Sequence, residues 1–289
     1  MLEMNLLDFT HNEEFPFFIQ YWVHIGNMLM YSHKDFSELV IVTEGSARHI
    51  VDNESYVISK GDVFVISGDT EHGFPDAQDL RICNIMFDPS FWTKNCYDIK
   101  KTAGFQALFV LEPQYSKQSN FRSRLKLGAG DYVKIFSICD DMQSNYTERG
   151  EGWQTLFISG FLRLAAELSQ LYLKTSDSSD PMINLAKAIA HIESYYTQNI
   201  EVAELAAISN YSVRQFIRIF KKIYDCKPTE YIRRLRMKNA CILLKSGSLL
   251  ITDIAIRCGY GDGNYFIRVF TKDMRITPRE YRKRNQALE

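Results

Sequence analysis

The sequence predicts a two-domain α+β protein, in which a strand-rich barrel with a helical extension precedes an entirely helical second domain. Three observations support this fold class. The 289 residues are enough for two hydrophobic cores. The hydrophobic pattern changes from short β-like segments to helical spacing after Pro89. A polar stretch that ends at Pro181 then separates two helical regions.

The region from residue 18 to about residue 90 is typical of β-structure. Its segments are short, rich in Val, Ile, Phe and Tyr, and bounded by Gly, Asp or Asn. Turn signals recur at roughly the 8–12-residue spacing of an all-β barrel or sandwich. The predicted strands are Ser37–Thr43, Ser46–Asp52, Ser55–Ser59, Asp62–Ser67 and Leu80–Asp88.

Two helices are expected to follow, over Asp131–Glu148 and Trp153–Tyr172. The second has apolar residues at the 3/4 spacing of one helical face. We therefore place the first domain at residues 1–174, a linker at 175–182 and the second domain at 183–289.

The composition excludes several classes of protein. The N-terminus lacks the basic and apolar regions of a secretory signal, and no apolar run approaches the ~18 residues that span a bilayer. The six cysteines are scattered without a C-x-x-C pair, which is typical of free thiols in a reducing compartment. We expect a cytoplasmic protein that does not contact the membrane.

The net charge of −1 hides an asymmetry between the two domains. Residues 182–289 hold 19 Lys and Arg against 10 Asp and Glu, whereas residues 1–181 hold 15 against 25. A basic domain attached to an acidic one is typical of a module that binds nucleic acid. A solvated basic surface would explain the charge equally well, so the assignment depends on further signals.

The second domain contains an internal repeat. The two copies, 49 or 50 residues apart, share three short motifs: Glu204–Ala206 and Asp253–Ala255, Phe216–Phe220 and Phe266–Phe270, and Pro228–Tyr231 and Pro278–Tyr281. Each copy predicts a helix-turn-helix, with first helices Val202–Ile208 and Ile251–Arg257. The turns contain Asn210 and Gly259, which tolerate left-handed backbone, and Ser212 and Asp262 can cap the second helices.

Each second helix is expected to bury a Phe-rich face and to expose basic residues, as a helix in the major groove does. A plain helical bundle is the alternative, and two copies in register within the basic half make it less favoured.

Residues 183–284 resemble the DNA-binding domain of the AraC/XylS family over its whole length. The second copy carries the signature almost intact, in Ile254–Ala255, Gly259–Tyr260, Tyr265–Phe270 and Thr277–Arg282. The resemblance implies two helix-turn-helix subdomains joined by a long helix, here about Thr229–Lys245, whose recognition helices enter successive major-groove segments.

The positions that match the family's DNA-contacting residues imply base-edge contacts from both recognition helices. The resemblance also implies that Arg218 and Arg268 contact phosphates. Gly263 departs from the family's usual polar residue, so we expect most discrimination to come from the first helix, through Arg214. The DNA-binding residues are predicted to be Ser212, Val213, Arg214, Gln215, Ile217, Arg218, Lys221, Asp262, Gly263, Asn264, Ile267, Arg268 and Lys272.

Two segments of the first domain resemble degenerate cupin motifs. The first runs from His33 through Glu38 to Gly45, with Asp35 in place of the second histidine, and the other runs from Gly61 to His72. A complete cupin site holds a divalent metal, because imidazole and carboxylate suit first-row ions. AraC-type regulators of this layout generally use the barrel for a small effector, commonly a sugar, without metal.

We therefore expect His33, Glu38, Arg48 and His72 to bind an effector, with Phe36 or Tyr56 as an aromatic platform, and we expect neither a metal nor another cofactor. Structural roles for these residues, or a metal site, are the alternatives. Since no nucleophile elbow or phosphate loop is present, we do not expect an enzyme, although a cupin metalloenzyme with an accessory helix-turn-helix domain stays the rival hypothesis.

The resemblance also implies the partners. We expect a sequence-specific transcription regulator, an activator that contacts double-stranded DNA and RNA polymerase and responds to a carbohydrate effector. The Trp153–Tyr172 helix is expected to form a homodimer interface, because a second apolar row widens its stripe; the alternative is that it packs on its own barrel alone. A regulator whose first domain only dimerises is a third possibility.

Overall fold

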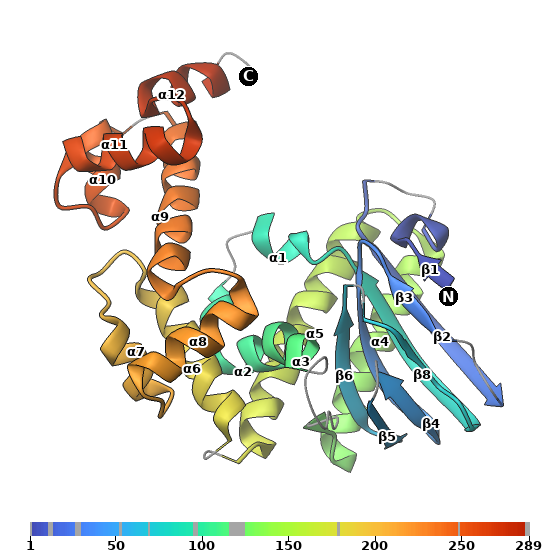
Figure 1. Ribbon diagram of the computed structural model, residues 1–289. Coiled ribbons are helices and arrows are strands. Elements are labelled where there is room, and N and C mark those ends of the chain that lie inside the picture. The colour runs from blue at the N-terminus through green and yellow to red at the C-terminus, as the bar shows by residue number, and fades with distance from the viewer. Residues whose placement is uncertain are drawn as a thin grey trace. The chain divides into compact units, whose positions relative to one another are not determined.

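The chain divides into two compact units, Met1–Ala186 and Lys187–Glu289, each with its own core. The computed structural model in Figure 1 describes residues 2–10, 14–26, 30–51, 54–68, 70–94, 98–115, 125–177, 180–247 and 249–286. The first unit is a strand-rich half-barrel followed by helices, and the second is entirely helical, as the sequence predicts.

The described residues of the first unit form a nine-stranded sheet that curls into the half-barrel. A 3-10 turn, η1 (Leu6–Asp8), follows the first strand. The strands are β1 (Leu2–Met4), β2 (Phe17–Gly26), β3 (Tyr31–His33), β4 (Ser37–Val51), β5 (Glu54–Ser59), β6 (Asp62–Ser67), β7 (His72–Gly73), β8 (Ala77–Phe87) and β9 (Leu125–Lys126).

Strand β4 organises the sheet because its two halves pair with different neighbours. Its first half pairs antiparallel with β6, and its second half pairs with β5 and β7. Most of the strand also pairs with β8, which in turn pairs with β2. The sequence predicts two strands here, whereas the structure has one. Gly45 takes a φ of +69° where the register of β4 against β8 shifts, and the pairing of the two strands continues past this glycine.

The first half of β4 is buried on both faces. Val40 and Val42 pack inside the barrel with Phe64, Ile82 and other apolar residues of the facing strands. Leu39 and Ile41, which point the other way, are equally buried. A strand that is covered on both faces reads as a continuous apolar run, which explains why strict alternation is missing from its sequence.

Helices complete the first unit. Sequence periodicity predicts the last two, and the structure confirms them with slightly extended ends; it adds short helical segments between residues 90 and 115 that the sequence does not predict. The segments are α1 (Ser90–Lys94), η2 (Asp98–Lys101), α2 (Ala103–Phe105), η3 (Gln106–Leu111), α3 (Glu112–Tyr115), α4 (Ala129–Glu148) and α5 (Trp153–Thr175).

Helix α5 packs within its own unit along the predicted stripe. Phe157, Phe161, Leu164, Leu168 and Tyr172 are all completely buried. Among the helices of the described residues, α5 is the one with the length and hydropathy of a possible membrane span, with a mean hydropathy of 1.2 over 18 residues. Core helices of folded domains also meet this criterion, and the buried stripe accounts for the apolar residues of α5 on that face.

The second unit contains two helix pairs at the ends of one long helix, α9 (Figure 1). Its elements are α6 (Pro181–Tyr195), which begins in the first unit, α7 (Val202–Ile208), α8 (Val213–Tyr224), α9 (Pro228–Lys245), α10 (Ile251–Arg257), α11 (Gly263–Met274) and α12 (Pro278–Gln286). Within the predicted linker 175–182, α5 ends at Thr175 and α6 starts at Pro181, and residues 178 and 179 lie outside the described residues. The predicted domain boundaries stay a prediction.

Candidate functional site

The helix pairs α7–α8 and α10–α11 have the turn geometry of helix-turn-helix elements. Asn210 and Gly259 occupy equivalent turn positions with φ of +55° and +82°, which confirms the left-handed backbone that the repeat predicts. The Ser212 hydroxyl accepts a hydrogen bond from the Gln215 amide, and the Asp262 carboxylate accepts from the amides of Asn264 and Tyr265. Both caps therefore satisfy amides that the first turn of each second helix leaves unpaired.

The buried and exposed faces of α8 and α11 are clearly separated. Phe216 and Phe220 of α8, and Phe266 and Phe270 of α11, are completely buried, which fixes the rotation of each helix about its axis. The opposite faces are exposed. Of the 13 predicted DNA-binding residues, Ile217 and Gly263 are half-buried, and the others are exposed: Ser212, Val213, Arg214, Gln215, Arg218, Lys221, Asp262, Asn264, Ile267, Arg268 and Lys272.

These exposed faces combine the two kinds of group that a major-groove helix needs. Arg214, Gln215 and Asn264 offer hydrogen bonds that can distinguish base edges. Val213 and Ile267 are apolar yet 43% and 37% exposed, and such side chains suit the methyl group of thymine. The guanidinium of Arg268 lies over the ring of Tyr265 at 5.8 Å, at the surface of α11.

Arg236 of α9 is a structural residue that sequence reasoning missed. It donates hydrogen bonds to three backbone carbonyls: those of Tyr196 (2.6 Å), Gln198 (2.7 Å) and Gly259 (3.0 Å). It therefore joins the segment before α7 to the turn before α11. Backbone acceptors carry no side-chain signature, so the sequence offers no signal by which to find this role.

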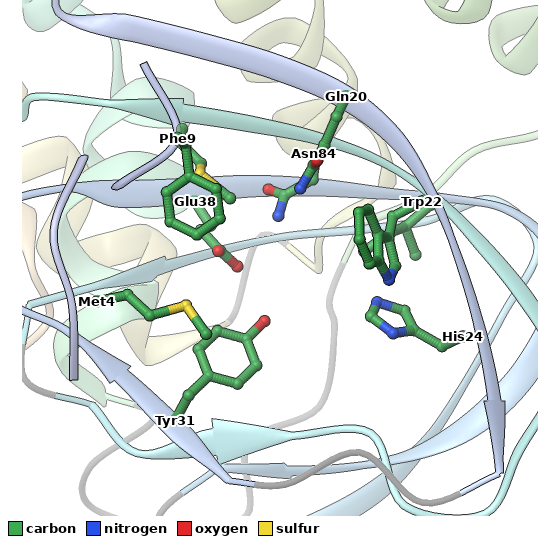
Figure 2. Close-up of a pocket in the computed structure, with 10 residues that line it drawn as sticks. Met4, Phe9, Gln20, Trp22, His24, Tyr31, Glu38 and Asn84 are labelled. Atoms are coloured by element: carbon green, nitrogen blue, oxygen red, sulfur yellow. The ribbon is translucent and has the colours of Figure 1, made fainter. Parts of the chain in front are cut away.

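A cavity of about 190 Å³ lies in the barrel of the first unit (Figure 2). A cavity of this order can hold one small ring. Its wall is mostly apolar and carries a few polar groups: the lining residues are Met4, Phe9, Gln20, Trp22, His24, Tyr31, Glu38, Ile82, Asn84 and Met86.

Three of the four predicted effector residues meet beside this cavity. His33 of β3, Glu38 of β4 and His72 of β7 are each at most 1% exposed. The Nε2 atoms of the two histidines are 3.0 Å apart. His33 Nε2 lies 3.3 Å from one oxygen of the Glu38 carboxylate, and His72 Nε2 lies 3.9 Å from the other. Glu38 also lines the cavity.

The fourth predicted residue, Arg48, lies apart from this group. Its side chain is 51% exposed and donates to the Asp76 carboxylate at 2.7 Å. The suggested aromatic platforms do not line the cavity either, because Phe36 stacks on His33 and Tyr56 bonds to His49. Trp22, which is 49% exposed, lines the cavity instead.

The cavity is built by strands that the motifs do not mark. Gln20, Trp22 and His24 come from β2, and Ile82, Asn84 and Met86 come from β8, paired in an antiparallel register. In both sets alternate residues point inward, so period-2 reasoning could have found them once β2 was recognised as a strand. Figure 2 shows Gln20, Trp22, His24 and Asn84 facing Met4 and Tyr31 across the cavity.

Burial and neighbouring charge act in different directions on the buried titratable groups of the barrel. Burial lowers the pKa of His72 well below its ordinary value and lowers the pKa of His49 to about 3. Burial alone would raise the pKa of the Glu38 carboxyl, but the neighbouring His33 and His72 outweigh it and lower that pKa to about 2.

The comparisons with known proteins cover both units. A family profile described as an AraC-like ligand binding domain matches residues 27–124, and one described as a helix-turn-helix domain matches residues 205–284. An HTH-type transcriptional activator RhaR of Mannheimia succiniciproducens is 24% identical over 284 residues, covering 98% of each chain. An HTH-type transcriptional activator RhaS of Klebsiella pneumoniae is 26% identical over 259 residues, covering 89% of this chain and 88% of the relative. The solved structure of ToxT from Vibrio cholerae is 16% identical, covers 92% of this chain and 98% of that one, and has a TM-score of 0.33.

Proposed function

The chain belongs to the AraC family of transcription regulators, and from this we propose that it binds a specific DNA sequence under the control of a sugar held in its first unit. The observation that carries the proposal is the pair of capped helices α8 and α11, each with a buried Phe-rich face and an exposed basic and polar face. We assign no catalytic role to the chain.

We propose that the two recognition helices contribute unequally. Helix α8 offers Arg214 and Gln215 near its N-terminus, where a helix in the major groove meets base edges. At the matching end of α11, Gly263 offers no side chain. The backbone there does not demand glycine, because an added Cβ would meet only Thr252 at ordinary contact distance. Asn264 is then the group that can pair with adenine, while Arg218 and Arg268 contact phosphates.

Replacing Arg214 with alanine is expected to relax base preference at one or two operator positions. Each lost bidentate contact to a base removes about 1–3 kcal/mol of discrimination. The measurement is binding of the variant to a library of randomised operator sequences. Arg218→Ala is the matched control on the same helix: it should weaken binding to all sequences alike and reduce the salt dependence. If Arg214→Ala behaves as Arg218→Ala should, Arg214 contacts phosphate.

We propose that the effector occupies the cavity of the first unit. A sugar offers an apolar ring face and several hydroxyl groups, and the cavity offers the Trp22 indole beside the polar groups of Gln20, His24, Glu38 and Asn84. His33 and His72 would then act on the effector through Glu38, which they contact directly. The sugar class also rests on the resemblance of the whole chain to regulators of this layout.

A thermal-shift screen of monosaccharides and their acids tests this proposal. A ligand at a hundredfold excess over its Kd should stabilise the protein by about 2.7 kcal/mol. Trp22→Ala should remove that shift, whereas Val23→Ala, at the next position of β2 and outside the cavity lining, should retain it. A shift that survives Trp22→Ala unchanged would place the effector elsewhere, and the lack of a shift with any compound would favour a first unit that only dimerises.

The remaining roles follow the family and stay proposals. We propose a cytoplasmic homodimer that activates transcription through RNA polymerase. The buried stripe of α5 is already occupied by its own unit, so a partner would use Leu156 and Leu173, which are exposed, with the half-buried Leu162 and Ala166. Sedimentation of the full chain tests the dimer, and a monomer at tens of micromolar would contradict it.

A further inference from the structure

A cluster of three ligand-type side chains lies in the core of the first unit. The side-chain atoms of His33, Glu38 and His72 that could bind a metal all lie within 4.8 Å of one another. They come from three different strands, β3, β4 and β7, and each residue is at most 1% exposed. Groups of this kind are rarely buried together unless something compensates their lost hydration.

The spacing of these atoms suits a shared cation. In a tetrahedral zinc site with Zn–N distances of 2.0–2.1 Å, two imidazole nitrogens are about 3.3 Å apart. The Nε2 atoms of His33 and His72 are 3.0 Å apart, and His33 Nε2 is 3.3 Å from the nearer Glu38 oxygen. A single N–H at His33 Nε2 can point at His72 Nε2 or at the Glu38 carboxylate, but it cannot bond fully to both. A cation satisfies all three atoms at once.

Packing aims the two rings at this common point. Phe36 stacks on His33 with ring centroids 4.3 Å apart, and Tyr31 lies 4.2 Å from His72. Within the described part of the chain, the Nδ1 atoms of His33 and His72 have no hydrogen-bond partner. The convergence of the Nε2 atoms is therefore not a by-product of hydrogen bonding at the other ring nitrogen.

We propose that His33, Glu38 and His72 bind one divalent first-row transition metal ion, with Zn²⁺ as the best fit to two imidazoles and a carboxylate. The set differs from the four-ligand pattern that the cupin motif implies. Asp35 stands where the motif has its second histidine, and its carboxylate instead accepts a hydrogen bond from the Leu6 amide at 2.8 Å. Three protein ligands leave the ion a position for water or for a ligand hydroxyl group.

The inference goes beyond the proposed function and does not depend on it. DNA binding by the second unit needs no metal, and the cavity can hold an effector with or without an ion beside it. Because Glu38 belongs to both the cluster and the cavity wall, an ion would lie next to the proposed effector site. Sensing through this site would then respond to metal supply as well as to the effector.

Titration of the untagged full-length protein with Co²⁺, after treatment with a chelator, tests the inference directly. We expect visible absorption that saturates at one equivalent per chain, without the intense thiolate bands that binding to cysteines would give. Unmodified protein should also melt at a higher temperature with one equivalent of Zn²⁺ than with chelator. The second measurement needs no variant, so it stands even where a substitution impairs folding.

Glu38→Gln and His72→Gln should each lose the saturable cobalt signal. His49→Gln is the matched control, because His49 is an equally buried barrel histidine outside the cluster, and it should retain the signal. Thiolate bands, retention of the signal in both cluster variants, or no change of melting temperature with Zn²⁺ would each overturn the inference. None of these results would touch the DNA-binding or effector proposals, which have their own readouts.

Discussion

Replacing Arg236 with alanine is expected to lower the stability of the second unit by about 3 kcal/mol and to weaken operator binding at least about tenfold. The guanidinium donates to the carbonyls of Tyr196, Gln198 and Gly259, and it lies 5.4 Å from the centre of the Tyr260 ring. Alanine removes these contacts together and leaves three carbonyls to find other donors.

DNA binding should suffer because Arg236 ties two segments to one helix. One precedes α7 and the other contains the turn before α11, so the contacts set how the two helix-turn-helix elements sit on α9. Two recognition helices on one duplex bind tightly only when both can engage at once. A loosened arrangement therefore costs affinity even though no base contact has been removed.

Chemical denaturation and operator titration at one salt concentration measure both effects. Arg234→Ala is the matched control on the same helix, since Arg234 is exposed and forms an i,i+4 ion pair with Glu230, worth about 0.5 kcal/mol. Arg236→Lys keeps the charge, but the lysine ammonium lacks the guanidinium fork and cannot reach all three carbonyls. The stability and operator affinity of this variant should therefore lie between those of the two alanine variants. Equal behaviour of the Arg236 and Arg234 alanine variants would show that the carbonyl contacts are dispensable.

The second unit was predictable in detail because its signals are local and repeated. Helix caps, left-handed turn residues and Phe spacing each act within one turn of helix, and two copies reinforce one another. Val202–Ile208 and Ile251–Arg257 have the predicted bounds, and the long helix begins one residue before the predicted Thr229. What escaped prediction is the contact between distant segments through Arg236, where the acceptors are backbone atoms.

The first unit was predictable in class but less so in its site. The cupin-like motifs led to His33, Glu38 and His72, which strand pairing does bring together. Arg48, which lies outside both motifs and was expected only as a further polar group of the effector site, is placed at the surface. The cavity wall depends on the register of β2 against β8, whose paired residues run from Phe17 and Phe87 to Gly26 and Ala77, and neither strand alone specifies which residue of the other it will face.

Replacing Gly259 with alanine is expected to destabilise the second unit by about 3 kcal/mol, through two separate effects. The residue has a φ of +82°, a conformation that costs a residue with a Cβ about 1 kcal/mol. In addition, the new Cβ would lie 2.3 Å from the carbonyl oxygen of Thr197, which belongs to the backbone and cannot simply rotate away. Relieving such an overlap costs about 1–3 kcal/mol.

The neighbouring glycine separates these effects from a general loss of chain flexibility. Gly261 has no positive φ, and an alanine Cβ there would meet nothing within 4 Å, so Gly261→Ala should change stability by less than about 1 kcal/mol. Gly259→Asn tests the two effects against each other, because asparagine tolerates the left-handed backbone, as Asn210 does in the first copy, yet still carries a Cβ. We expect the asparagine variant to stay destabilised by the contact with Thr197. If the asparagine variant instead has wild-type stability, the left-handed backbone alone explains the glycine. The turn at Gly259 would then accept the same residue as the turn at Asn210.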